Sequence, residues 1–375
     1  MTLPPFALER YFAPHEHRVP FLFSSSDCEP LTLERLLTLA DLETRKLWND
    51  LRLGYTESQG LLALRQEIAN LYVTVSADDI VVVVPEEGIL LAMHAVLQSG
   101  DHVISMFPGY QSLYEVARDI GCAIDHWEPN ERNGRHFDPT ALNRLSRPTT
   151  RLLVINFPHN PTGYLPSAQE FQALVAWAQQ RGIRIFSDEM YRFLEFAPED
   201  RLSSAVDCDD RALVLFGMSK SFGLAGLRIG WLATKDRAIL DRVKELKDYT
   251  TICASAPAEV LALIGLRARS TIVGEHLTRI QGNLSLLDGF VSDNPGIISP
   301  VRPRAGSVCL ASLDTGESAS SFCRRIVEEA GVMVLPSTVF NFGDRHIRIG
   351  LGREHFPDAL RNFERYVTEG RNLKA

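Results

Sequence analysis

Three short segments of the sequence hold the residue types best suited to covalent and acid–base chemistry. They are 156–163 (NFPHNPTG), 187–191 (SDEMY) and 217–231 (GMSKSFGLAGLRIGW). Each begins where a run of aliphatic or β-branched residues ends, and such a run is typical of a buried strand. Because ligands of open α/β sheets bind at the carboxyl ends of the strands, we expect the three segments to meet at one edge of a sheet.

Two charged residues in these segments suggest a particular chemistry. Asp188 follows the apolar run 183–186, so its carboxylate is expected to be buried and to need a cationic or donor partner. Lys220 follows another predicted strand, and a lysine that faces a cleft there can lose its charge and become a nucleophile. Together they suit pyridoxal phosphate, whose aldehyde forms a Schiff base with a lysine and whose ring nitrogen is kept protonated by an acid. Taken singly, Asp188 could form a structural salt bridge and Lys220 could be a solvated loop residue.

The elements that position these segments follow from the spacing of apolar residues. Short apolar runs predict strands, and the amphipathic runs between them predict helices. Strands are expected at residues 80–84, 102–106, 152–156, 183–187, 213–217 and 227–233. Helices are expected at residues 87–97, 112–120, 167–180 and 237–249. This alternation predicts an α/β fold with a mainly parallel sheet that is flanked by helices on both faces.

The pattern changes after about residue 257. A long helix is expected at 272–291, followed by strands at 307–311, 332–335 and 346–349 and by helices at 318–330 and from 356 onward. This mixture is typical of a smaller α+β domain. We therefore predict an N-terminal segment (1–45) that packs with the small domain, a large cofactor-binding domain (46–260) and a small C-terminal domain (261–375).

Composition and charge exclude several classes of function. The 375 residues include 39 Lys+Arg and 47 Asp+Glu, a net charge of −8, and this balance argues against nucleic acid as a partner. The longest strongly apolar stretch is far shorter than the roughly 20 residues that span a bilayer, and the N-terminus does not resemble a secretory signal. The six cysteines are scattered without a C-x-x-C pair, so we expect no disulfide framework, no metal site and a cytoplasmic location.

The order and wording of the three segments resemble fold-type I pyridoxal-phosphate enzymes of the class I/II aminotransferase family, over roughly residues 20–370. The resemblance implies an aspartate-aminotransferase-like fold. It implies that Lys220 is the Schiff-base lysine, which also moves the Cα proton, and that Asp188 is the partner of the pyridinium nitrogen. It further implies that Asn160 and Tyr191 donate hydrogen bonds to the ring O3′.

The same resemblance implies contacts for the phosphate and for an amino acid substrate. Ser219 and Arg228 match the family's phosphate ligands, and a planar cation fits a phosphate bidentately. Tyr110 lies where an aromatic ring stacks on the cofactor, and Arg348 matches the arginine that binds the substrate α-carboxylate. Tyr55 resembles the tyrosine that reaches the phosphate of the neighbouring subunit, which implies at least a homodimer.

Two segments depart from the family pattern. The phosphate cradle usually is a small Gly/Ser/Thr turn, but here it contains Glu86 and Glu87, so we assign only their main-chain amides to the phosphate. Near the N-terminus, Cys28 lies where many relatives have a glycine beside the substrate. We predict substrate contacts for Ser25 and Cys28 and a pocket unlike that of a generic aspartate or aromatic transaminase.

The reaction type stays open between two enzyme hypotheses. The first is an aminotransferase that exchanges an amino group with a 2-oxo acid. The second follows from the segment 8–12 (LERYF), which resembles a subgroup that includes cyclases of the capreomycidine- and enduracididine-forming type, acting on hydroxylated arginine. There, Glu9 or Asp27 would receive the guanidinium, because a carboxylate matches its planar fork. A third hypothesis, a non-catalytic binding module, is disfavoured by the absence of a basic patch.

Overall fold

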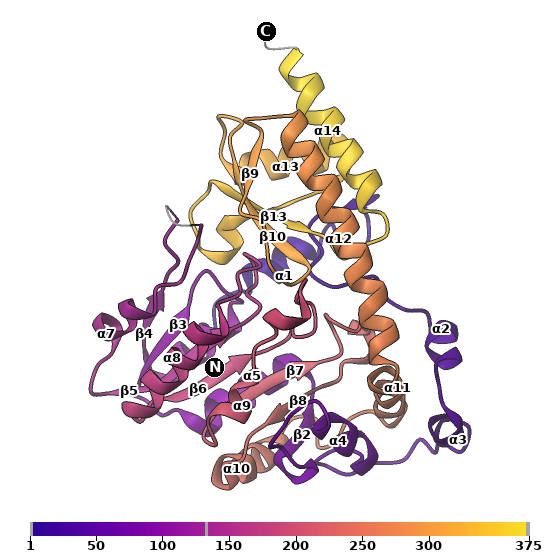
Figure 1. The fold of residues 1–375 in the computed structure, drawn as a ribbon, viewed down its shortest axis with the longest axis vertical. Coiled ribbons are helices and arrows are strands. Elements are labelled where there is room, and N and C mark those ends of the chain that lie inside the picture. The colour runs from indigo at the N-terminus through magenta and orange to yellow at the C-terminus, as the bar shows by residue number, and fades with distance from the viewer. Residues whose placement is uncertain (1–2, 132–133, 373–375) are drawn as a thin grey trace.

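A seven-stranded sheet forms the centre of the larger part of the molecule. The computed structural model describes residues 3–131 and 134–372 (Figure 1). The strand order is β2-β8-β7-β6-β5-β3-β4, and all strands are parallel except β8, which is antiparallel to β2 and β7. The strands are β2 (Ile80–Val83), β3 (His102–Met106), β4 (Ala123–Trp127), β5 (Thr150–Asn156), β6 (Arg184–Asp188), β7 (Leu213–Gly217) and β8 (Gly230–Ala233). The predicted mainly parallel sheet is therefore confirmed.

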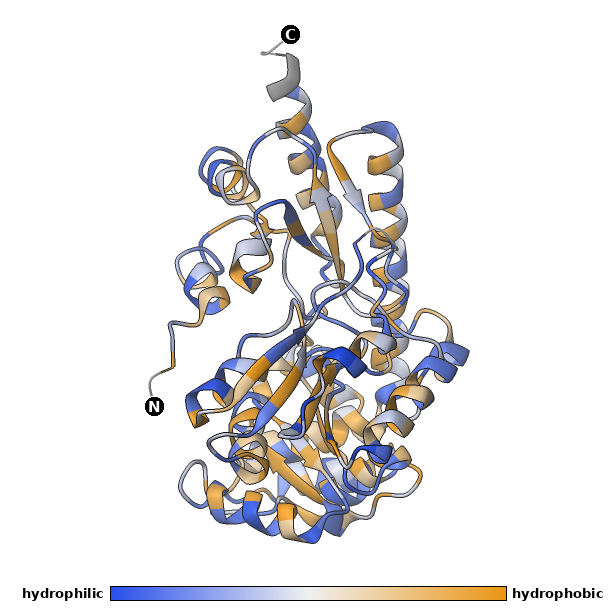
Figure 2. Ribbon diagram, turned by 90° about the vertical axis from the view of Figure 1, so that its left-hand side faces the viewer, coloured by the Kyte–Doolittle hydropathy of each residue, from blue (hydrophilic) through white to orange (hydrophobic). Residues whose placement is uncertain are grey.

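Helices cover both faces of this sheet, and successive side chains along a strand point to opposite faces. Val81 and Val83 pack into the apolar cluster on the face of α5, α6 and α10, whereas Ile80 and Val82 pack into the cluster on the face of α4, α8 and α11. Figure 2 shows hydrophobic residues along the strands and hydrophilic residues on the outer surfaces of the helices. These helices are α4 (Leu62–Ala69), α5 (Pro85–Val96), α6 (Ser112–Ile120), α8 (Ala168–Gln180), α10 (Arg237–Lys247) and α11 (Ala256–Arg267).

A second, antiparallel sheet forms the smaller part of the molecule, with the order β12-β13-β10-β9. Its strands are β9 (Ile298–Pro300), β10 (Val308–Leu313), β12 (Leu335–Pro336) and β13 (His346–Gly350). The helices α13 (Ala319–Ala330) and α14 (Phe356–Asn372) accompany it, and the long helix α12 (Arg269–Asp293) runs beside α14 toward the larger sheet (Figure 1). This arrangement is the α+β unit that the sequence predicts.

The N-terminal segment contacts both parts of the molecule. Its first residues pack with the smaller part, whereas residues 31–40 pack against the larger part. β1 (Phe21–Leu22) pairs in parallel with β11 (Val332–Met333), and α1 (Ala7–Phe12) packs against the 3-10 turn η5 (Ser337–Phe340). The remaining helices are α2 (Leu33–Thr38), α3 (Leu42–Asn49), α7 (Leu142–Leu145) and α9 (Ala205–Cys208). The domain boundaries near residues 45 and 260 stay a prediction.

Several elements differ from the prediction, for identifiable reasons. β4 is an edge strand whose residues are mostly half-buried and include polar side chains, so it lacks an apolar run. α11 is buried nearly all round, so it lacks the amphipathic period that identifies a helix. The strand predicted from residue 227 begins at Gly230, because Arg228 adopts a left-handed conformation with φ 54°.

No helix in residues 3–131 and 134–372 combines the length and apolarity needed to cross a bilayer.

Candidate active site

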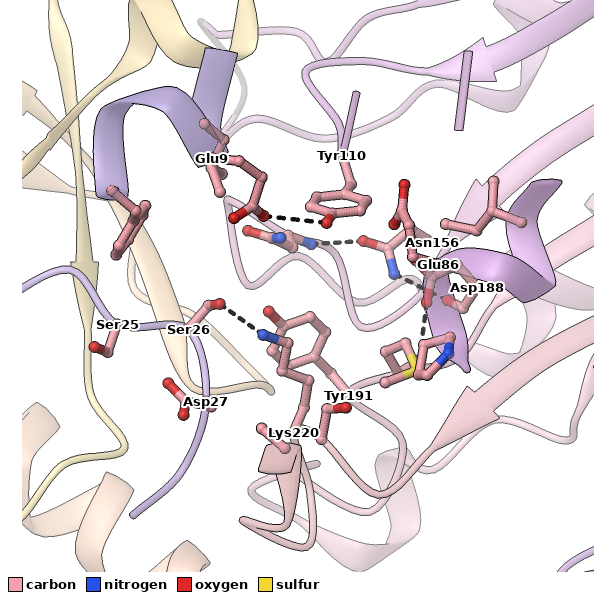
Figure 3. A pocket seen from close by; sticks show the side chains of 18 of the residues that line it. Glu9, Ser25, Ser26, Asp27, Glu86, Tyr110, Asn156, Asp188, Tyr191 and Lys220 are labelled. Atoms are coloured by element: carbon pink, nitrogen blue, oxygen red, sulfur yellow. Dashed lines mark hydrogen bonds between the residues drawn. The ribbon is translucent and has the colours of Figure 1, made fainter. Parts of the chain in front are cut away.

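One cavity of about 510 Å³ lies at the carboxyl ends of the larger sheet's strands, beneath the N-terminal segment. It brings together residues that lie far apart in the sequence and come from both parts of the molecule (Figure 3). The predicted site residues that line it are Glu9, Ser25, Glu86, Tyr110, Asn160, Asp188, Tyr191, Ser219, Lys220, Arg228 and Arg348. Two walls of the cavity are distinguished by the residues that form them. The strand-end wall consists of Asn156, Asn160, Asp188, Ser219 and Lys220, and the N-terminal wall consists of Phe6, Glu9, Ser25, Ser26 and Asp27.

Sheet register aligns the strand-end wall. Asn156 ends β5 and pairs with Asp188 at the end of β6, and Asp188 pairs in turn with Leu215 of β7. Asn156 Nδ2 donates to the backbone carbonyl of Asp188 at 2.9 Å, and its Oδ1 accepts from the backbone N–H of Asn160 at 2.8 Å. Asn156 thus fixes two strand ends and the following turn. Asn156 had no predicted role, although it begins one of the three segments.

The turn after β5 is also held against the smaller part of the molecule. Gly163 ends this turn with φ 70°, and a Cβ atom there would lie 2.3 Å from a Pro303 side-chain carbon. Only glycine combines this backbone conformation with such a close approach. The turn therefore fixes Asn160 relative to both sheets.

Asp188 is a buried carboxyl group whose pKa is strongly perturbed. Its side chain accepts a hydrogen bond from the backbone N–H of Met190 at 3.0 Å. Burial raises the pKa of Asp188 to about 7, because the charged form loses its hydration, while the charge of Lys220 opposes this shift. A positively charged N–H group placed beside Asp188 would restore its ionised form. A protonated pyridine nitrogen is such a group.

Lys220 projects into the same cavity from the segment that follows β7. Its Nζ donates to the Ser26 hydroxyl at 2.9 Å, across to the N-terminal wall (Figure 3). Burial lowers the pKa of Lys220, and the positive charge of Arg348 lowers it further, whereas Asp27 raises it. A lysine with a lowered pKa has more of the neutral amine that reacts with an aldehyde.

Arg348 lies on β13 and reaches the cavity from the smaller part of the molecule. Its Nη1 donates to Asn160 Oδ1 at 3.2 Å and its Nη2 to the Ser24 carbonyl at 2.9 Å. Burial lowers the pKa of Arg348 to about 10, so it stays cationic at neutral pH. Its side chain is almost fully buried, and among the described residues no carboxylate forms a salt bridge with it. Such a guanidinium suits a carboxylate that arrives with a ligand.

The remaining predicted cofactor contacts line the end of the cavity where Arg228 lies close enough to Glu86 to affect its pKa. Ser219 is buried, and its hydroxyl has no hydrogen-bond partner among the described residues. Arg228 donates only to the Ala225 carbonyl, at 3.2 Å, among the hydrogen bonds of the described residues. Glu86 lies in the first turn of α5 and lines the same space. An unpartnered hydroxyl and an available guanidinium fit a phosphate group, so this donor set fits pyridoxal phosphate.

Tyr110 connects this end of the cavity to α1. Its hydroxyl donates to Glu9 Oε1 at 3.4 Å (Figure 3). Its ring lies 4.9 Å from the ring of Phe6. Burial raises the pKa of Tyr110, so it stays a neutral phenol. Phe6 could not be identified from the sequence, because a lone aromatic residue in an irregular segment carries no pattern.

Three predicted site residues lie outside the cavity lining. Cys28 is fully buried, and burial raises the pKa of its thiol to about 12, so it stays protonated. Glu87 points away, since its carboxylate accepts from the Thr251 hydroxyl at 2.8 Å and the Val84 N–H at 3.1 Å. Tyr55 is 92% exposed in the single chain. Their assigned roles stay predictions.

The neighbours of Cys28 include one residue with no predicted role, Ser26, and one that was a candidate for a substrate guanidinium, Asp27. Ser26 and Asp27 line the cavity in its place, and Asp27 also forms an ion pair with Arg353 at 2.8 Å. In the segment 24–30 the sequence alone could not determine which side chains point inward, because this loop has no regular period. Glu16 and Phe12 of the N-terminal segment also line the cavity.

Comparisons with known proteins agree with this geometry. Capreomycidine synthase of Streptomyces vinaceus is 28% identical over 265 residues, covering 70% of this chain and 67% of that protein. Aspartate aminotransferase of Thermococcus kodakarensis is 27% identical, covering 82% and 79%. The crystal structure of a PLP-dependent aminotransferase from Streptococcus suis is 29% identical and superimposes with a TM-score of 0.92, covering 98% and 99%. The family described as aminotransferase class I and II matches residues 23–360, and the chain belongs to this family.

Proposed function

We propose that this chain is a pyridoxal-phosphate-dependent aminotransferase that moves an amino group from an α-amino acid to a 2-oxo acid. One observation carries the proposal. Asp188, at the end of β6, and Lys220, just after the adjacent strand β7, line a single cavity with a buried Arg348, for which the described residues offer no carboxylate partner. A buried acid, an amine of lowered pKa and an anion-binding guanidinium are the groups that this chemistry requires.

Asp188 and Lys220 act at two different atoms, the ring nitrogen of the cofactor and the Cα of the substrate. Bound pyridoxal phosphate supplies an aldehyde and a ring that withdraws electrons from the substrate Cα. Asp188 holds a proton on the ring nitrogen, which keeps the ring electron-poor. The Lys220 amine would take the proton from the substrate Cα and return it to the carbon of the cofactor's former aldehyde, and its lowered pKa favours the neutral, basic form. Asn160 and Tyr191 donate to the ring O3′.

The binding residues orient both molecules. Arg348 binds the substrate α-carboxylate in the plane fixed by its bonds to Asn160 and the Ser24 carbonyl. Ser219, Arg228 and the main-chain amides of Glu86 and Glu87 hold the phosphate. Ser25 lies beside the substrate. These assignments use groups that line the cavity, except Glu87.

We also propose that the enzyme works as a homodimer in the cytoplasm. Tyr55 is 92% exposed and Leu53 is 84% exposed, and neither contributes to the cavity of its own chain. In a dimer, Tyr55 would reach the phosphate of the partner's site. The six cysteines are all free, which suits a reducing compartment.

The decisive experiment locates the lysine that bonds to the cofactor. The protein is loaded with pyridoxal phosphate, reduced with borohydride and mapped by peptide mass spectrometry. We expect the label on Lys220. Lys247 is an internal control, since burial also lowers its pKa but it lies on α10, outside the cavity lining. A label on Lys247, or no label, would overturn the proposal.

A second candidate function is the elimination or cyclisation of a hydroxylated arginine. Glu9 and Asp27 line the cavity, and Asp27 already has Arg353 as a partner, which leaves Glu9 as the freer carboxylate. The similarity to capreomycidine synthase supports this alternative. The test supplies arginine or hydroxyarginine without any 2-oxo acid. Repeated turnover under these conditions would favour cyclisation, and a single amino-transfer event per site would favour transamination.

A further inference from the structure

Glu86 is a carboxyl group in a place where the proposed function puts a dianionic phosphate. It is the second residue of α5, at the helix end whose free N–H groups suit an anion. Its side chain lines the cavity together with Ser219 and Arg228, which are the groups best suited to the phosphate. An ionised Glu86 would therefore repel the phosphate at close range.

The groups around Glu86 act on its protonation in both directions. Burial raises its pKa, and the negative charge of Glu9 on α1 raises it further. The hydroxyls of Ser112, at the start of α6, and Tyr110, just before it, lower the pKa of Glu86, and so does the positive charge of Arg228. On the sheet side, Glu86 and Asp188 face the same cavity, and the charge of Glu86 raises the pKa of Asp188.

We propose that Glu86 is a positioning residue that carries a proton when the cofactor is bound, so that its neutral carboxyl group faces the phosphate. A protonated carboxyl group has one O–H donor, which can hydrogen-bond a phosphate oxygen, whereas the ionised group has only acceptors. The proposal rests on the proposed function in one respect, which is that the phosphate occupies this end of the cavity.

Cofactor affinity then depends on pH through Glu86. A bound phosphate would pair with Arg228, whose charge otherwise stabilises ionised Glu86. The pKa of Glu86 is therefore higher in the loaded protein than in the free protein. Binding therefore takes up a proton, and the affinity falls as pH rises between the two pKa values, by about tenfold for each unit that separates them. Ionisation of Lys220 and of the phosphate also changes affinity with pH, but both contributions are shared by variants that differ only at Glu86.

The experiment measures the dissociation constant of pyridoxal phosphate from about pH 6 to pH 9, by absorbance and tryptophan fluorescence, for the wild type and Glu86→Gln. We expect similar affinities at the acidic end and binding by the variant that is at least about tenfold tighter at the alkaline end. The matched control is Glu115→Gln. Glu115 is a buried carboxylate on α6 that pairs with Arg118 and lies outside the cavity lining, so its pH profile should parallel the wild type.

A second pair of proteins keeps the test decisive if Glu86→Gln does not fold. Tyr110→Phe keeps the ring and removes a hydroxyl that favours ionised Glu86, so the loss of affinity should move to higher pH. Calorimetry in buffers of different ionisation enthalpy should show proton uptake on binding by the wild type, and less by Glu86→Gln. Parallel pH profiles of the wild type and Glu86→Gln would overturn the role of Glu86. If Glu86→Gln does not fold, parallel profiles of the wild type and Tyr110→Phe would overturn it. Failure of the wild type to bind the cofactor at any pH would instead overturn the proposed function.

Discussion

The two walls of the cavity are built in different ways. The strand-end wall is fixed by sheet register, because Asn156, Asp188 and Leu215 are neighbours across β5, β6 and β7. The N-terminal wall is formed by a six-residue helix and an irregular loop, which are held by isolated contacts such as the 2.9 Å bond from Ala7 N–H to Gln111. A rigid wall suits the invariant steps of cofactor chemistry. A wall made of loops can change its side chains without disturbing the sheet, so we infer that it selects the substrate.

The strongest way to break this comparison is to remove the nucleophile from the strand-end wall. Lys220→Ala should lower kcat for amino transfer by at least about a thousandfold, because both the covalent link and the proton carrier are lost. Absorbance should also show that the variant no longer forms the covalent adduct with pyridoxal phosphate. Thermal unfolding monitored by circular dichroism provides the control for folding. If Lys220→Ala kept near-normal kcat, the chemistry would have to lie elsewhere.

A second prediction concerns the effect of buried Asp188 on the stability of the cofactor-free protein. The pKa of Asp188 is about 7 in the folded chain against a usual 3.8, so the ionised form is disfavoured by folding. The free energy of unfolding therefore falls as pH rises from the pKa of the unfolded state to the pKa of the folded state. Above the folded-state pKa, Asp188 causes no further change. Asp188→Asn in the cofactor-free protein should therefore be more stable than the wild type at pH 8, by about 2 kcal/mol or more.

The same variant links stability to function. Urea unfolding at pH 8 and at about pH 4 measures the difference, which should shrink toward acidic pH, because at about pH 4 the carboxyl group is neutral in the folded state and only partly ionised in the unfolded state. Asp188→Asn should nevertheless lose most of its activity with the cofactor bound. A variant that is less stable than the wild type at pH 8 would show that Asp188 is a structural residue.

The difference between the walls also explains what the sequence could predict. Asp188 and Lys220 follow apolar runs whose period marks them as strand ends, so their meeting follows from the rule for parallel sheets. The bond between Lys220 and Ser26 joins residues 194 positions apart, and nothing periodic in the loop sequence indicates it. For the same reason Cys28 was predicted to contact the substrate, whereas Ser26 and Asp27 line the cavity. Tertiary contacts of irregular segments leave no local signal.

A third prediction tests the residue that reaches the cavity from the smaller sheet. Arg348→Lys should raise KM for the amino acid by about ten- to a hundredfold, because a lysine cannot make the bidentate contact with a carboxylate. The dissociation constant of the cofactor should change little, since Arg348 reaches the cavity from β13, whereas Ser219 and Arg228 come from the segment that follows β7. Steady-state kinetics and a cofactor titration separate the two effects. Equal losses in KM and cofactor affinity would contradict this division of labour.

The smallest effect, and the one that sharpens the comparison most, is expected at Glu9. Glu9→Gln removes the negative charge that faces the cavity from α1 and keeps the contact with Tyr110 in neutral form. If the N-terminal wall selects the substrate, KM for arginine should rise by about tenfold while KM for an uncharged amino acid stays within about twofold. Glu16→Gln is a matched control, because Glu16 also lines the cavity from the N-terminal segment but already lies near His17. Equal changes in KM for both amino acids would mean that the charge of Glu9 does not select the substrate. Substrate choice would then depend on the apolar residues beside Glu9.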